Sequence, residues 1–218
     1  MMRWDLINFF IKTFNYKKYL ELGVSNGECF SKINAESKIS VDLAMGQYSN
    51  SNPTYKMTTD EFFETVVTPE PRWWDNDKLD EKYDIIFIDA LHHLEQVDKD
   101  IVNSLNCLND NGTIILHDCN PLVKEHQIVP RESRAWNGDA WKSIVKFRSL
   151  NNGRACVIPE DEGLGIIHNG VYYPFEIELP KELTWDWLVK NRTAALGLSS
   201  FEDVEKMLPE EELIWRQK

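Results

Sequence analysis

The chain has 218 residues, of which 42% are hydrophobic, and this length and composition suit one α/β domain with a tail. Its formal net charge of −12 at pH 7 argues against a nucleic acid partner, because a phosphate backbone repels an acidic surface. No stretch approaches the roughly 20 apolar residues of a membrane helix, and no signal peptide is evident, so we expect no membrane partner. The four cysteines are widely spaced, which is typical of reduced thiols and indicates a cytoplasmic location.

Apolar periodicity predicts alternating helices and strands along most of the chain. The clearest strand is the run Tyr83-Asp84-Ile85-Ile86-Phe87-Ile88-Asp89, which is typical of a central parallel strand buried on both faces. Helices are expected over 3–12, 28–33, a segment after Asp60, 97–108 and 139–150. Further strands are expected over 18–22, 38–42, 53–57, 113–118, 156–158 and 164–167.

This alternation predicts a doubly wound α/β sheet with right-handed crossovers. We expect one domain over residues 1–175 and a helical C-terminal appendage over residues 176–218. Tryptophans gather in the appendage and in a charged loop before the central strand: Trp185, Trp187 and Trp215, and Trp73 and Trp74. Exposed aromatic residues are typical of subunit contacts, which makes a homo-oligomer one expected partner.

The most informative segment is Glu21-Leu22-Gly23-Val24-Ser25-Asn26-Gly27. An apolar strand ends in an acid, and two glycines four residues apart follow it. About fifteen residues later, the next apolar strand ends in Asp42. In doubly wound sheets, ligands bind at the carboxyl ends of the strands, near the point where the strand order reverses. The pattern therefore predicts a nucleoside-binding crevice.

The loop favours S-adenosylmethionine (SAM) over a dinucleotide. A dinucleotide loop needs G-x-G-x-x-G so that the backbone can approach the pyrophosphate, and Ser25 stands here in place of the middle glycine. SAM has no phosphate, and its ribose and ammonium group suit acids. We expect Asp42 to accept the ribose hydroxyls and Glu21 to face the ammonium group. A turn that merely needs a positive φ would give the same residues, so this alternative stays open.

Further segments follow in a fixed order. They are Phe87-Ile88-Asp89-Ala90-Leu91-His92, Asn111-Gly112-Thr113, Leu116-His117-Asp118-Cys119-Asn120-Pro121 and Trp136-Asn137-Gly138-Asp139-Ala140-Trp141-Lys142. Together with the glycine loop and Val41-Asp42, this ordered set resembles the class I SAM-dependent methyltransferases over about residues 5–170. The branch it resembles is the bacterial one of small-molecule and sugar O-methyltransferases.

The resemblance implies a Rossmann-like seven-stranded sheet, mostly parallel with an antiparallel last strand, and helices on both faces. It also implies a SAM site lined by Glu21, Gly23, Ser25, Gly27 and Asp42. Asp60 is the candidate for contact with the adenine amino group, although a role as helix cap is an alternative. Asp89 is expected to orient either the SAM amine or His92.

Methyl transfer to a hydroxyl requires an aligned acceptor and a base that removes its proton. His92 lies three residues after Asp89, at the mouth of the predicted crevice, and histidine titrates near neutral pH. We therefore predict His92 as the general base, with Asp89 as its catalytic partner. His93 is the alternative base, and a structural role for both histidines stays open.

Asp89 and Asp118 end two strands that should be neighbours, about 4.8 Å apart. Their carboxylates are the candidate ligands of one Mg²⁺ ion, which would lower the pKa of the acceptor hydroxyl. The related metal-dependent enzymes have Asp or Asn directly after the second acid. Here Cys119 follows, a poor magnesium ligand, and Asn120 comes one residue late. In the alternative without a metal, Asp118 caps the loop that leads into Asn120.

The sequence therefore predicts a SAM-dependent methyltransferase that acts on a hydroxyl of a small molecule or saccharide. The N/D-P-P-Y motif of amino-group methylation is absent after the central strand, which favours oxygen as the acceptor atom. Trp136, beside Arg131 and Arg134, is a candidate acceptor lid. Two alternatives stay open: a non-catalytic SAM-binding scaffold protein, and an NAD-dependent enzyme, which would need a pyrophosphate site.

Overall fold

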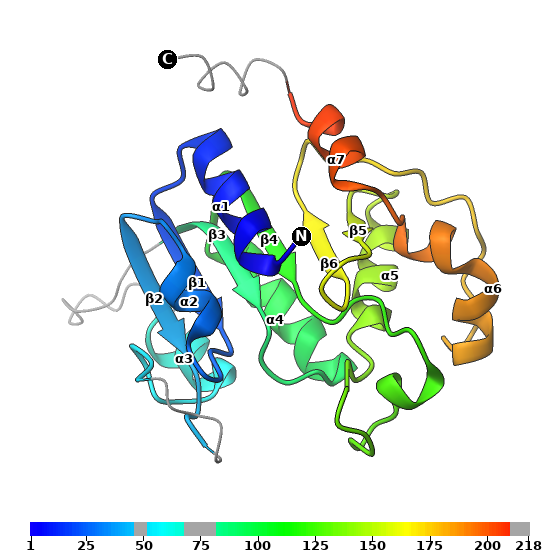
Figure 1. Cartoon of the computed structure of the whole chain (residues 1–218), viewed down its shortest axis with the longest axis horizontal. Helices are drawn as coiled ribbons and strands as arrows, with labels where there is room; N and C mark the ends of the chain where they lie inside the picture. Colours follow the sequence, from blue (N-terminus) through cyan, green and yellow to red (C-terminus); the bar gives the residue numbers. More distant parts are fainter. Residues whose placement is uncertain (46–51, 68–81, 210–218) are drawn as a thin grey trace.

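The computed structural model describes residues 1–45, 52–67 and 82–209, so Trp73, Trp74 and Trp215 lie outside the described residues. Helices and strands alternate along the chain, as the apolar periodicity predicts (Figure 1). In chain order they are α1 (Arg3–Phe14), β1 (Lys18–Leu22), α2 (Glu28–Lys32), β2 (Ser37–Val41), α3 (Thr59–Thr65), β3 (Tyr83–Ile88), α4 (Leu94–Asn106), β4 (Leu108–Leu116), the 3-10 turn η1 (Lys124–Gln127), α5 (Trp141–Leu150), β5 (Cys156–Ile158), β6 (Leu164–Ile167), α6 (Trp185–Leu196) and α7 (Phe201–Met207). Within these ranges, each helix is too short or too polar to span a bilayer.

The strands form one sheet in the order β2-β1-β3-β4-β6-β5. Strands β2, β1, β3 and β4 are parallel, whereas β6 runs antiparallel to both β4 and β5. The mostly parallel sheet with an antiparallel last strand is therefore confirmed. The order reverses between β1 and β3, and the carboxyl ends of these two strands bound the crevice that the motifs predict.

The expected seven-stranded sheet is wrong, because the described residues form six strands. Of the strand expected over residues 53–57, only Tyr55 pairs with the sheet, in an isolated parallel bridge to Val41. Two local features end the ladder there. Pro53 has no backbone N–H to donate, and the hydroxyl of Thr54, rather than a carbonyl, accepts from the backbone N of Ser40 at 3.2 Å.

Alternate side chains of the strands enter two separate cores. On β3, Ile86 and Ile88 belong to a core covered by α3, α4, α5 and α6, whereas Ile85 and Phe87 belong to a core covered by α1, α2 and α7. All four side chains are buried. This burial on both faces explains why the central strand reads as a continuous apolar run.

The segment after residue 175 contributes to both cores. Leu188 and Leu196 of α6 lie in the first core, and Val204 of α7 lies in the second. Figure 1 shows α6 beside α5 and α7 near α1, where the rings of Phe9 and Phe201 pack edge to face with centroids 4.8 Å apart. The segment is helical as expected, and the division of the chain at residue 175 stays a prediction.

Arg148 of α5 connects α6 to the core through hydrogen bonds of its buried side chain. The side chain is buried, and its guanidinium donates to the carbonyl oxygens of Ala195 (2.9 Å), Ala194 (3.1 Å) and Tyr173 (3.2 Å), and also to that of Ala155. The carbonyls of Ala194 and Ala195 lie in the last turn of α6, where the helix dipole favours a positive charge. Burial lowers the pKa of Arg148 to about 10, so the group stays charged at neutral pH.

We expect Arg148→Met to lower the free energy of unfolding by about 3 kcal/mol, because four buried or half-buried carbonyls lose their donor. The control is Arg154→Met, which removes an exposed arginine a few residues away and should change stability by less than about 0.5 kcal/mol. Urea denaturation measures both. Equal stability of the two variants would contradict the structural role of Arg148.

Candidate active site

The loop after β1 has a left-handed backbone at three residues: Gly23 (φ 87°), Ser25 (φ 49°) and Gly27 (φ 78°). At Gly23 a Cβ would lie 2.2 Å from the carbonyl oxygen of Asp89, so only glycine lets the loop pack against the end of β3. Gly27 forms the N-cap of α2. The glycines therefore allow the left-handed backbone of the loop. Gly23 also allows the loop to pack directly against the predicted site.

Asp42 holds this loop in place. Its Oδ2 accepts hydrogen bonds from the backbone N of Val24 (2.7 Å) and Ser25 (3.0 Å), and its Oδ1 accepts from the backbone N of Ala44 (2.6 Å). An ionised carboxylate has about four lone-pair sites. Three are occupied, which leaves capacity for about one further donor from a ligand.

A cavity of about 850 Å³ opens at the carboxyl ends of the parallel strands, a volume typical of small-molecule and cofactor sites. The predicted site residues in its lining are Glu21, Gly23, Ser25, Asp42, Asp60, Asp89, His92 and Asp118. Gly27 shapes the loop without lining the cavity, and His93 is likewise outside the lining. The structure therefore brings nearly all of the predicted residues together.

Asp60 lies in the first turn of α3 but is not its cap. The N-cap is Thr58, whose hydroxyl accepts from the backbone N of Glu61 at 3.1 Å, while the carboxylate of Glu61 accepts from the backbone N of Thr58 at 2.9 Å. The alternative role of Asp60 as helix cap is wrong, because this Thr-x-x-Glu capping box takes its place. Asp60 instead accepts from Gln96 and Lys99, both at 2.9 Å, and these donors lower its pKa.

Glu21 is buried at the end of β1, where its Oε2 accepts a hydrogen bond of 2.5 Å from the hydroxyl of Tyr19. Burial raises the pKa of Glu21 to about 8, so its carboxyl group is mainly neutral at neutral pH. A cation in the cavity would favour the ionised form. This arrangement is compatible with the expected contact to an ammonium group.

His92 lies between the two predicted acids. Its Nε2 is 3.2 Å from Oδ1 of Asp89, and its Nδ1 is 3.2 Å from Oδ2 of Asp118. Although burial disfavours the imidazolium, the hydrogen bond to Asp89 and the charge of Asp118 raise the pKa of His92. The indole of Trp136 stacks on the ring at 5.3 Å. His93, by contrast, is the N-cap of α4 and meets the ring of Trp136 edge-on.

His117, directly after β4, is a site residue that was not among the predicted site residues, although it lies in the motif segment with Asp118. Its Nδ1 is 2.9 Å from Oδ2 of Asp118 and 3.3 Å from Oδ1 of Asp89. Despite burial, the charges of these two carboxylates raise the pKa of His117 well above its usual value. Burial alone would raise the pKa of Asp89, but His117 and His92 hold it far below its ordinary value. Ligands bind at the carboxyl ends of parallel strands, so the argument that predicted Asp118 as a site residue applies equally to His117.

The first turn of α1 and the turn between β5 and β6 complete the cluster. The carboxylate of Asp161 accepts from Arg3 at its backbone N (2.7 Å), Nε (2.9 Å) and Nη2 (2.9 Å), and Nη1 of Arg3 donates to Asp89 at 3.0 Å. Asp161 and Glu162 both have positive φ values, 49° and 62°. Such backbone is costly for residues other than glycine and concentrates at functional sites.

The loop over residues 136–139 holds His92 and Asp118 in position. A Cβ at Gly138 would lie 2.0 Å from the carbonyl oxygen of His92, and this carbonyl accepts from the backbone N of Asp139 at 3.0 Å. Asn137 donates from Nδ2 to Oδ1 of Asp118 at 2.6 Å. The segment stood out in the sequence only through the family resemblance, and the structure gives it a positioning role.

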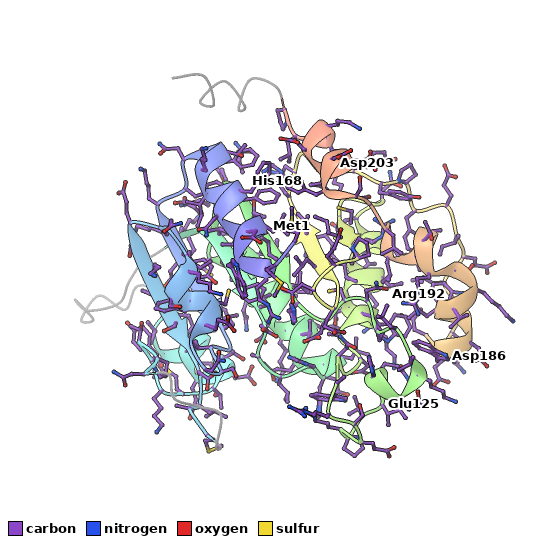
Figure 2. All side chains as sticks on the ribbon, viewed as in Figure 1. Met1, Glu125, His168, Asp186, Arg192 and Asp203 are labelled. Carbon is purple, nitrogen blue, oxygen red and sulfur yellow. The ribbon has the colours of Figure 1, made fainter. Side chains whose placement is uncertain are left out.

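Among the described residues, Asp89, His92 and Asp118 each offer one potential metal-ligand atom, and these atoms lie within 4.8 Å of one another. The residues directly after Asp118 face elsewhere. Cys119 is buried with its thiol near backbone carbonyls, and Oδ1 of Asn120 accepts from Arg192 of α6 at 2.7 Å (Arg192 is labelled in Figure 2). The imidazole of His92 is therefore a third potential metal ligand beside the two predicted carboxylates.

Comparisons with known proteins agree with this geometry. Residues 20–119 match the family model of a methyltransferase domain. The fold is similar to that of the O-methyltransferase TomG from Streptomyces achromogenes, solved in complex with SAM and involved in tomaymycin synthesis (10% identity, 75% of this chain and 78% of that chain covered, TM-score 0.51). It is also similar to that of a candidate caffeoyl-CoA O-methyltransferase from Staphylococcus aureus (19% identity, 75% and 80% covered, TM-score 0.50). Curated protein sequences give no match.

Residues 20–119 therefore match a methyltransferase domain, and the fold of the chain is similar to that of solved O-methyltransferases. The methyltransferase resemblance predicted from the ordered motifs is confirmed at this level.

Glu21 provides a test of the site's electrostatics through its raised pKa. A carboxyl group whose pKa rises from 4.5 to about 8 on folding contributes stability that is lost as pH rises between these values. We expect the stability of the wild type relative to Glu21→Gln to fall by about 1 kcal/mol per pH unit over that range. Urea denaturation at several pH values measures the difference. Glu28→Gln, which changes an exposed glutamate of α2, is the control.

Parallel stability curves for the wild type and Glu21→Gln would show that Glu21 is not held neutral by the fold.

Proposed function

We propose that this chain transfers a methyl group from SAM to a hydroxyl group of a small molecule or a saccharide. The observation that carries the proposal is the position of His92, between Asp89 and Asp118, in the same cavity as the glycine loop and Asp42. Methylation of a hydroxyl needs a base beside the methyl donor, and one cavity offers both. Two structures of similar fold carry names of O-methyltransferases, which supports the same choice.

The donor end of the cavity is the loop side. Asp42 has acceptor capacity left for a ribose hydroxyl, and the buried Glu21 suits a positively charged amine. Asp60 lines the cavity between Gln96 and the loop, where an adenine amino group would find an acceptor. The close approach of Gly23 to the end of β3 holds the loop against this part of the cavity.

His92 suits the role of general base in its neutral form. The acceptor oxygen attacks the methyl carbon in line, the carbon–sulfur bond breaks, and the hydroxyl proton passes to an imidazole nitrogen. The resulting imidazolium is stabilised by Asp89 and Asp118. These carboxylates raise the pKa of His92. The positive sulfonium of SAM would lower it again and so favour the neutral base before transfer.

In the alternative in which His92 is not the base, Asp89 and Asp118 fit a divalent cation such as Mg²⁺, because that ion prefers carboxylate oxygens, and His92 offers a third potential ligand atom within 4.8 Å. When bound, the ion would lower the pKa of the acceptor hydroxyl and fix its orientation. The three residues would then position the acceptor against the donor. A homo-oligomer and a cytoplasmic location stay predictions.

Binding of S-adenosylhomocysteine (SAH) tests the cofactor. We expect calorimetry to show that the wild type binds SAH and that Asp42→Ala weakens binding at least about tenfold, because the backbone N–H groups of Val24, Ser25 and Ala44 lose their acceptor. Asp42→Asn keeps one acceptor oxygen and should fall between them. A wild type that binds NAD but no SAH at millimolar concentration would favour the dinucleotide alternative and contradict the proposal.

The two adjacent histidines provide a matched test of the base. We expect His92→Gln to lower the rate of methyl transfer by about 10²- to 10⁴-fold with little change in SAH affinity, because a positioned base contributes that much. His93→Gln should retain the rate, since His93 lies outside the cavity lining. Release of SAH with a panel of sugar and phenolic acceptors measures both.

Equal losses in the two variants would contradict the assignment of His92. A protein that binds SAH but methylates no acceptor in the panel would support the non-catalytic scaffold alternative.

A further inference from the structure

The two carboxylate oxygens of Asp89 face different partners. Oδ1 lies 3.2 Å from Nε2 of His92 and 3.3 Å from Nδ1 of His117. Oδ2 accepts a hydrogen bond of 3.0 Å from Nη1 of Arg3. The terminal torsion of an aspartate is broad, so a carboxylate without such a contact can rotate and exchange its two oxygens. The contact with Arg3 therefore fixes which oxygen of Asp89 faces His92.

Arg3 is itself held by Asp161. Oδ2 of Asp161 accepts from the backbone N (2.7 Å) and Nε (2.9 Å) of Arg3, and Oδ1 accepts from Nη2 at 2.9 Å. Because both groups are planar, this two-pronged contact fixes the orientation of the guanidinium as well as its position. The side chains are only 23% and 6% exposed, so water and salt screen the pair less than a surface pair. Nη1 is left free of Asp161 and reaches Asp89.

The turn that carries Asp161 is anchored to the end of β4. The backbone N of Cys119 donates to the carbonyl of Gly163 at 3.0 Å, and the backbone N of Asn120 donates to that of Glu162 at 2.9 Å. Asp161 and Glu162 keep their costly left-handed backbone within this contact. The sheet therefore fixes the position of Asp161, and Asp161 in turn fixes the first turn of α1.

We propose that Arg3 and Asp161 are positioning residues for the proposed base, His92. Asp161 orients the guanidinium of Arg3, and the guanidinium orients the carboxylate of Asp89 toward the imidazole. The inference rests on the proposed function, in which the imidazole takes the proton of the acceptor hydroxyl. A carboxylate that is already oriented stabilises the resulting imidazolium without reorganisation during the reaction. Both positioning residues lie outside residues 20–119, the segment that matches the methyltransferase domain.

The two residues differ in their access to the cavity. Arg3 lines it, and could therefore act on a ligand directly, whereas Asp161 is outside the lining. A loss of rate on substitution of Asp161 would therefore not come from a lost contact with the cofactor or the acceptor. Asp161→Asn is the sharper variant for this reason. It keeps the size of the side chain but directs an amide nitrogen at groups of Arg3 that are donors themselves.

Steady-state kinetics of the full chain, with turnover expressed per SAH site counted by calorimetry, test the proposal. We expect Arg3→Met and Asp161→Asn each to lower kcat by about 10- to 100-fold, because the base loses its fixed geometry. The acceptor KM and the SAH affinity should stay within about threefold of the wild type, since the ligand contacts remain. Lys12→Met removes an exposed cation from the same helix and is the matched control, with the kcat of the wild type expected.

Combined variants test whether Arg3 acts through His92. In the His92→Gln background, we expect Arg3→Met and Asp161→Asn to cause no further loss of kcat, because the group that they position is absent. Additive losses would overturn the proposal. So would an unchanged kcat with a raised KM or a weakened SAH affinity, which would make Arg3 a ligand-binding residue. If Arg3→Met does not fold, Asp161→Asn decides, and a kcat equal to that of the wild type overturns the proposal.

Crystal structures of the wild type and of Arg3→Met give a readout that needs no turnover. We expect the carboxylate of Asp89 to rotate in the variant and to lose the 3.2 Å contact with His92. An unchanged carboxylate and an unchanged contact would overturn the positioning role. Failure of the wild type to bind SAH or to methylate any acceptor would overturn the proposed function instead, and the two structures would still decide whether Arg3 orients Asp89.

Discussion

Compensation of buried negative charge at the ends of β3 and β4 is the constraint on which the site depends. Asp89 and Asp118 end adjacent parallel strands, so the fold itself brings two carboxylates together. Isolated buried carboxylates are costly, and each must find a positive or hydrogen-bonding partner. Arg3, His92, His117 and Asn137 supply these partners from four separate segments of the chain.

Several backbone features exist only to bring these partners into contact. Asp118 has a left-handed backbone (φ 61°), and its carboxylate contacts both histidines. Gly163 packs so closely on the segment after β4 that a Cβ would lie 2.3 Å from the backbone N of Asn120. This close approach docks the turn between β5 and β6 on the site and delivers Asp161 to Arg3. Strain in the turn is therefore linked to the geometry of the charge cluster.

The sequence predicted the residues that follow strands and missed those that arrive from elsewhere. Gly23, Asp42, Asp89 and Asp118 obey a local rule, because the carboxyl ends of parallel strands share one edge of the sheet. The pair of Arg3 and Asp161 is separated by 158 residues and carries no motif, so only the tertiary structure reveals it.

The alternation of helices and strands followed from periodicity, whereas the number of strands did not. An apolar segment around Tyr55 has the composition of a strand, but ladder formation also needs free backbone donors, and Pro53 removes one. The capping box of Thr58 and Glu61 was visible as a four-residue pattern and displaced the assignment of a cap to Asp60. Two local sequence patterns can therefore predict different structures for one segment, and the structure shows which prediction is correct.

The loop that positions His92, the proposed base, also bounds the proposed acceptor end of the cavity. Trp136 stacks on His92, donates from Nε1 to the carbonyl of Ile128 at 2.6 Å, and lines the cavity together with Arg131. Two of the three residues expected in an acceptor lid are therefore at the cavity, whereas Arg134 is outside its lining. Because one loop fixes the imidazole and shapes the acceptor space, a change of acceptor preference through this loop would also move the base. In the proposed mechanism, acceptor selectivity and catalysis are therefore coupled through this loop.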